Sequence, residues 1–87
     1  SRGAWHHRAG GPVNSVQEFH VLTPQAAGVG ELEVTLVSPS GHRTPCPAKA
    51  VPGGQVVQFT PLEVGTCEIQ LKYGGEPVGK PRPFQVS

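Results

Sequence analysis

The chain contains no aspartate, and this absence excludes several functional classes. All six acidic residues are glutamate, whereas EF-hand loops and a Ser-His-Asp triad require aspartate. Charge of either sign is sparse, since seven Lys and Arg residues stand against six acids. A nucleic-acid surface needs a dense basic patch, so we expect no nucleic-acid partner. No apolar run reaches the length of about 18 residues that a membrane-spanning helix requires.

What the chain does contain is valine, glycine and proline in a length of 87 residues. This length accommodates one hydrophobic core and therefore one domain. Glycine and proline, at 12 and 10 residues, bring the composition near that of disordered chains. Twelve valines, together with leucine, phenylalanine and isoleucine, supply enough apolar side chains for a core. Because valine favours strands over helices, the composition predicts a small all-β domain.

Two-residue alternation of apolar and polar side chains predicts the strands. Leu32, Val34 and Leu36 face one way, and the intervening residues face the other. Similar alternation places Phe19, Val21, Val57, Phe59, Cys67, Ile69, Leu71 and Tyr73 inward. The expected strands are residues 4–9, 18–23, 31–37, 43–50, 56–60, 66–73 and 83–86. Seven short strands separated by regular turn signals predict a seven-stranded antiparallel immunoglobulin-like β-sandwich. Residues 12–87 form this domain, and residues 1–11 are an N-terminal segment or its first edge strand.

The two cysteines, Cys46 and Cys67, allow two interpretations. A disulfide between them would close a loop of about twenty residues and stabilise the fold by roughly 3 kcal/mol. Two free thiols in a reducing compartment are favoured, because Cys67 lies on the apolar face of its expected strand. Trp5 stands near the N-terminus rather than in a third strand, so the tryptophan-and-disulfide pattern of antibody domains is absent.

No residue pattern indicates a metal, a cofactor or catalysis. His6 and His7 point to opposite faces of a strand, and His20 and His42 stand elsewhere. Cys46 is the one conceivable nucleophile, but its flanking prolines offer no general base. We therefore expect a protein that is not an enzyme.

Several stretches in a fixed order resemble an immunoglobulin-like repeat of the filamin family of actin-crosslinking rods. They are FHV at 19–21, AGVGELEV at 27–34, SPSG at 38–41, FTP at 59–61, GTCEI at 65–69, KYGGEPV at 72–78 and PFQV at 83–86. No single motif is specific, whereas their order and spacing are. The resemblance implies a cytoplasmic, cytoskeletal scaffold whose partners are adjacent repeats of the same rod. Actin would be bound only through another domain.

The resemblance also implies a peptide-binding groove between the third and fourth strands. In the expected sandwich, residues 32–38 lie at a sheet edge with backbone groups free to accept an added strand. Pro45 and Pro47 remove two amide donors from one side of the expected fourth strand, so this strand can pair on its other side only. We expect cytoplasmic tails of membrane receptors, or adaptor peptides, to bind there by β-augmentation. The expected groove residues are Leu32, Val34, Thr35, Leu36, Thr44, Cys46 and Ala48.

Three other roles stay open from the sequence. The domain could act only as a spacer within the rod, with this edge covered by a neighbouring repeat. It could be an extracellular adhesion or receptor domain, for which a Cys46–Cys67 disulfide would be the signature. It could also be a lone filamin-like repeat of a signalling or ubiquitin-ligase protein.

Overall fold

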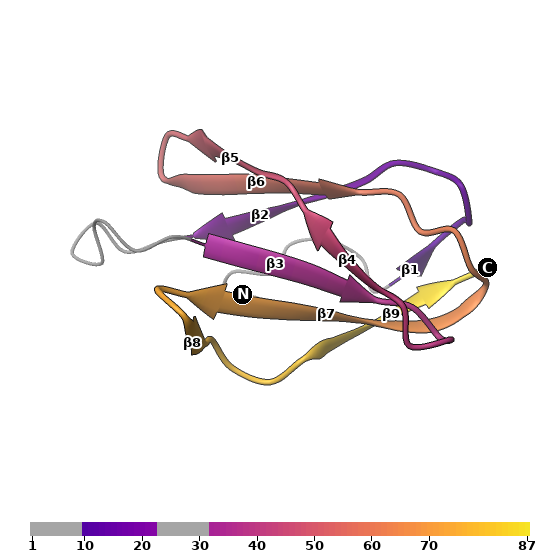
Figure 1. Cartoon of the computed structure of the whole chain (residues 1–87). Coiled ribbons are helices and arrows are strands. Elements are labelled where there is room, and N and C mark those ends of the chain that lie inside the picture. The colour runs from indigo at the N-terminus through magenta and orange to yellow at the C-terminus, as the bar shows by residue number, and fades with distance from the viewer. Residues whose placement is uncertain (1–9, 23–31) are drawn as a thin grey trace.

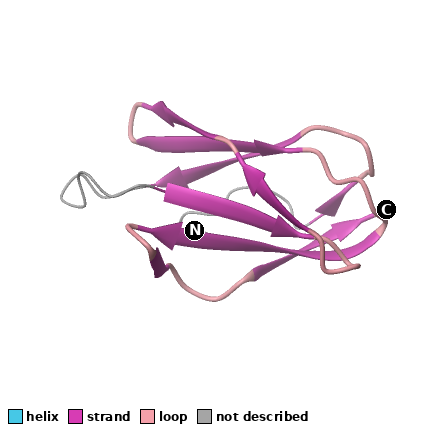
Figure 2. Ribbon diagram, in the orientation of Figure 1, coloured by secondary structure: helices cyan, strands magenta, loops and turns pink. Residues whose placement is uncertain are grey.

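Alternating side chains and frequent turns fold the chain into two stacked β-sheets (Figure 1). The structure is a computed structural model, and it describes residues 10–22 and 32–87. Within these residues Figure 2 shows only strands and loops, so no helix there could span a membrane. The strands are β1 (Gly10–Gly11), β2 (Gln17–Leu22), β3 (Leu32–Val37), β4 (Arg43–Cys46), β5 (Ala48–Val51), β6 (Gly54–Phe59), β7 (Gly65–Tyr73), β8 (Glu76–Pro77) and β9 (Arg82–Val86).

The larger sheet has the order β1-β9-β7-β3-β4, with β8 also paired to β7. The smaller sheet has the order β2-β6-β5. The all-β immunoglobulin-like sandwich is confirmed. The strand count differs because the expected strand 43–50 divides at Pro47, whose two flanking strands belong to different sheets. The short β8, which follows the glycine turn after Tyr73, is a further strand that alternation could not show.

The inward-facing residues of both sheets form one core, as the alternation predicts. Phe59 joins the sheets: its ring lies 6.0 Å from that of Phe19 and 5.2 Å from that of Phe84, both edge-to-face. Leu32 and Tyr73, at the ends of their strands, are only half buried. The buried hydrophobic residues are Phe19, Val21, Val34, Leu36, Cys46, Val57, Phe59, Cys67, Ile69, Leu71, Phe84 and Val86.

The first described strand differs from the antiparallel expectation. β1 runs parallel to β9, with Gly10 opposite Gln85. The backbones approach so closely that a Cβ on Gly10 would lie 2.6 Å from the Gln85 carbonyl oxygen. Gly10 and Gly11, which follow the expected strand 4–9, are therefore themselves paired residues. Trp5, His6 and His7, with the rest of the expected strand 4–9, lie outside the described residues.

Candidate functional site

The third strand is not at a sheet edge, which corrects the sequence-based expectation. β3 pairs with β7 along its whole length, from Leu32 to Val37. On its other side, Val34–Val37 pair with β4. The physical reason is that residues 43–46 fold back directly after the turn at residues 38–42 (Figure 1). Pro45 does not prevent this pairing.

The direction of the backbone groups explains how a proline fits into β4. The Ser38 amide donates to the His42 carbonyl at 2.8 Å. Because antiparallel pairs alternate, Leu36/Thr44 and Val34/Cys46 are the next hydrogen-bonded pairs, and Thr35/Pro45 exchanges no bond. The nitrogen of Pro45 thus faces away from β3, where a donor would have served an added strand. The outer edge of β4 is blocked, as the two prolines predict.

The structure brings together only part of the predicted groove. Leu36, Thr44 and Cys46 line a cleft of about 290 Å³ between the two sheets. Val34 is buried in the core and pairs with Cys46 of β4, and Thr35 lies on the opposite face of the larger sheet. Leu32 precedes the part of β3 that pairs with β4. The cleft is completed by Val16, Pro45, Pro47, Gln58, Phe59 and Thr60.

Ala48, the remaining predicted groove residue, lies on β5, which is an edge strand of the smaller sheet. The Gln58 amide donates to the Pro47 carbonyl at 3.3 Å. By alternation, Lys49 and Val51 bond to β6, whereas the amides and carbonyls of Ala48 and Ala50 point away from it. Both alanines are exposed although they share a face with core residues of β6. Among the described residues, β5 therefore presents an open backbone edge with small side chains.

Ala50 of β5 is a candidate that the residue pattern did not indicate. The pattern that could have indicated it is the run Ala48-Lys49-Ala50, a short proline-free segment between two prolines. The alternation alone could not identify this segment as a strand separate from residues 43–46. We call Ala48–Val51 with its outward backbone groups the β5 edge.

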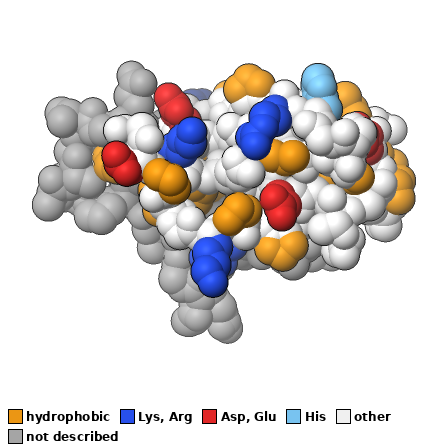
Figure 3. Space-filling view, turned by 60° about the horizontal axis from the view of Figure 1, so that its bottom comes forward, with side chains coloured by type: hydrophobic (Ala, Val, Ile, Leu, Met, Phe, Trp, Pro, Cys, Tyr) orange, Lys and Arg blue, Asp and Glu red, His pale blue; other side chains and the backbone are white. Residues whose placement is uncertain are grey.

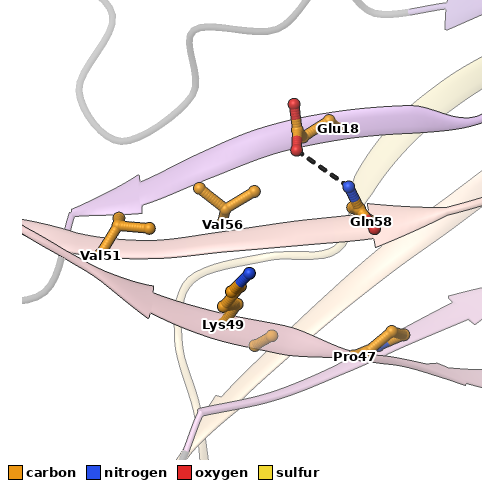
Figure 4. A pocket seen from close by; sticks show the side chains of 7 residues that line it. Glu18, Pro47, Lys49, Val51, Val56 and Gln58 are labelled. Carbon is orange, nitrogen blue, oxygen red and sulfur yellow. Dashed lines mark hydrogen bonds between the residues drawn. The ribbon is translucent and has the colours of Figure 1, made fainter.

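The outer face of the smaller sheet carries a shallow depression of about 380 Å³ beside the β5 edge. Val56 lies between Glu18 and Lys49, and the Gln58 side-chain amide donates to Glu18 Oε2 at 3.0 Å (Figure 4). Pro47, Ala48 and Val51 complete the lining. The depression holds no nucleophile beside a base, and its two opposite charges flank an apolar floor.

The cysteines are both buried and free. Cys46 on β4 and Cys67 on β7 are separated by β3. Strands lie about 4.8 Å apart, so the two Cα atoms exceed the separation of about 7 Å that a disulfide allows. Burial raises the pKa of Cys46 to about 11, although a backbone hydrogen bond from Leu36 acts against the rise. Burial, with a smaller effect of Glu63, also raises the pKa of Cys67.

The remaining functional candidates do not assemble into a site. The described residues contain no group of three or more His, Cys or Glu side chains that could hold a metal ion. His20 is exposed on β2, and His42 is exposed in the turn before β4. Figure 3 shows apolar side chains scattered among charged ones over one face. In the part of the chain that the structure describes, the exposed large hydrophobic residues are Val16, Leu62, Val64 and Val78.

Comparisons with known proteins agree on one family. A model of the Filamin/ABP280 repeat matches residues 2–85. Filamin-C of Mus musculus is 42% identical over 78 residues, covering 85% of this chain and 3% of the relative. Filamin-C of Rattus norvegicus is 40% identical over 78 residues, which again cover 85% of this chain and 3% of the relative. The chain thus spans a small fraction of these relatives. The crystal structure of the Lin-41 filamin domain superimposes with a TM-score of 0.77 at 16% identity, covering 91% of this chain and 83% of that one.

Proposed function

Because this chain belongs to the Filamin/ABP280 repeat family, we propose that it is a non-enzymatic rod and scaffold repeat of a filamin-like actin-crosslinking protein. Its neighbours in the rod are other repeats, and actin binds through a different domain. The identity of 42% to mouse Filamin-C supports the rod. The separation of the two cysteines opposes an extracellular disulfide-bonded domain.

We further propose that the repeat binds extended tails of receptors or adaptors by β-augmentation at the β5 edge. The observation that supports this is the direction of the Ala48 and Ala50 backbones, which offer two donors and two acceptors away from β6. An added strand obtains its generic affinity from such groups. The small alanine side chains leave room for apolar residues at alternate positions of the guest, and β3 contacts β5.

Amide-shift mapping by NMR tests this binding site. The probe is a peptide of alternating valine and serine with lysines at both ends, titrated into the isotope-labelled chain. We expect the largest shifts at residues 46–51 and 32–33. Shifts that cluster elsewhere would overturn the β5 assignment.

A pair of proline variants makes the test specific for backbone pairing. Ala50→Pro removes an outward donor without breaking the β5–β6 ladder, and we expect about tenfold weaker peptide binding in a folded domain. His20→Pro removes an outward donor from β2, the opposite edge of the same sheet, and serves as the matched control. Equal affinities for the two variants would show that the β5 backbone does not hold the peptide.

A further inference from the structure

We propose that β4 is a releasable strand, and that an extended peptide takes its place on β3. This inference rests on the proposed function, because it concerns how a peptide that reaches this repeat obtains more backbone partners. Release of residues 43–46 would uncover Val34 and Leu36, whose amides and carbonyls face β4. The predicted third-strand edge would then exist in the opened state only.

The contacts of β4 are fewer than those of the strand on the other side of β3. β4 covers Val34–Val37, whereas β7 pairs with all of Leu32–Val37. Only Cys46 of β4 is buried, and Arg43, Thr44 and Pro45 are exposed. The outer edge of β4 has no strand partner among the described residues. Segments with few buried contacts and exposed backbone bonds open locally before the whole domain unfolds.

A turn and a single residue bound β4. Before it lies the turn 38–42, and after it Pro47, whose carbonyl accepts from the Gln58 amide at 3.3 Å, leads into β5. One side-chain hydrogen bond fastens β4 across the outer face: Arg43 Nη1 donates to Gln70 Oε1 on β7 at 3.1 Å, at an exposed position. Release would therefore break the short ladder and this bond, and the β3–β7 ladder would stay paired.

The burial pattern also defines the guest. A strand that replaces β4 needs an amide at the positions of Thr44 and Cys46, because these residues form the hydrogen-bonded pairs with β3. Proline is tolerated only between them, as Pro45 is. At the position of Cys46 the guest needs a small apolar side chain, because that site is 8% exposed and belongs to the core.

The two cysteines report on the release in the unmodified chain. Alkylation by iodoacetamide at about pH 8, followed by peptide mass spectrometry, gives a rate for each thiol. Cys67 lies on β7 in the core and reports opening of the whole sandwich. We expect Cys46 to react about tenfold faster than Cys67, because release of β4 alone exposes it. Equal rates for both thiols over a series of urea concentrations would overturn the proposal.

A strand-exchange probe tests replacement directly. The probe is a peptide copying residues 42–48 with Pro45→Val, Cys46→Val and Pro47→Val. We expect it to accelerate alkylation of Cys46 about fivefold at saturation, with no change at Cys67. The control peptide carries Thr44→Pro in addition, which removes a donor that β3 requires, and should have no effect. Shifts at Ala48 and Ala50 without faster alkylation of Cys46 would leave the β5 site standing and overturn the release of β4.

The Arg43–Gln70 bond offers a mild variant that should keep the fold. Gln70→Ala removes the acceptor, and we expect Cys46 to react about threefold faster while Cys67 stays unchanged. Glu68→Ala is the matched control, since Glu68 is exposed on the same face of β7 two residues away. If both variants change the two thiol rates in parallel, β4 does not open on its own.

Discussion

Pro45 of β4 lies opposite Thr35 of β3 at a position where the two backbones exchange no hydrogen bond. Its ring therefore occupies the outer edge, and the pairs on either side of it remain intact. The same proline one residue earlier or later would stand at a hydrogen-bonded position. The chain thus closes this edge of the larger sheet to other strands and keeps its own ladder.

This relationship predicts different effects of proline at adjacent positions. Thr44→Pro removes a bond to Leu36 and should lower the free energy of unfolding by about 1–3 kcal/mol. Pro45→Ala removes only the restriction that the proline ring places on the unfolded chain, and it should lower the free energy of unfolding by about 0.4–1 kcal/mol. Urea denaturation of both variants measures the difference. Equal losses would mean that the register of β3 and β4 differs from the one described.

A second prediction concerns the start of β7, where Gly65 has a φ of +132°. A Cβ at this position would lie 2.9 Å from Pro39 Cγ. Gly65→Ala should therefore cost about 1–3 kcal/mol, from backbone strain and from contact with a rigid ring. Denaturant midpoints of the variant and the wild type measure this loss of stability.

Gly41→Ala separates the two causes of that loss. Gly41 has a φ of +93°, but a Cβ there meets no atom within 4 Å. Gly41→Ala should therefore lower the free energy of unfolding by less than Gly65→Ala does. Adding Pro39→Ala to Gly65→Ala should restore part of the stability if the contact matters; no recovery would assign the whole cost to the backbone.

The inward residues could be predicted because alternation along a strand depends only on local sequence. Phe19, Val34 and Ile69 are buried as their spacing indicates. The prolines likewise identified an edge. The partner of each strand could not be predicted in the same way, because pairing is decided by contacts between distant residues. Pro45 and Pro47 looked like one blocked strand, and only the structure shows that the chain changes sheets between them.

The candidate site shifted for the same reason. Leu36, Thr44 and Cys46 were expected together and do line one cleft. The sequence could not show that residues 43–46 pair with β3 where a guest strand was expected. Nor could it show which amides point outward, since this follows from the hydrogen-bond register rather than from residue type. Ala50 becomes a candidate through that register alone.

A third prediction concerns Phe59, whose ring contacts Phe19 of its own sheet and Phe84 of the other. Phe59→Ala should lower the free energy of unfolding by about 3–5 kcal/mol, because it leaves a cavity between the sheets. The exposed Leu62 provides the control, and Leu62→Ala should change stability by less than about 0.5 kcal/mol. Chemical denaturation at equal protein concentration compares them. A small loss for Phe59→Ala would mean that the sheets pack mainly through other residues.

Alkaline pH should destabilise the domain through Cys46. Its pKa is about 11 in the fold against 9.0 for an ordinary thiol. Below pH 9 both states hold the proton and the thiol has no effect on the pH dependence. Between pH 9 and 11 the unfolded chain releases its proton first, so the free energy of unfolding falls by up to about 1.4 kcal/mol per pH unit.

The measurement is urea denaturation from about pH 8 to pH 10 in the presence of a reducing agent, comparing the wild type with Cys46→Ala. The variant lacks the titrating thiol, and its stability should fall less steeply above pH 9. The two proteins differ only at residue 46, so the difference between the two slopes belongs to Cys46. A wild type and a variant with parallel slopes would show that the thiol is already in contact with water, as a permanently released β4 would make it.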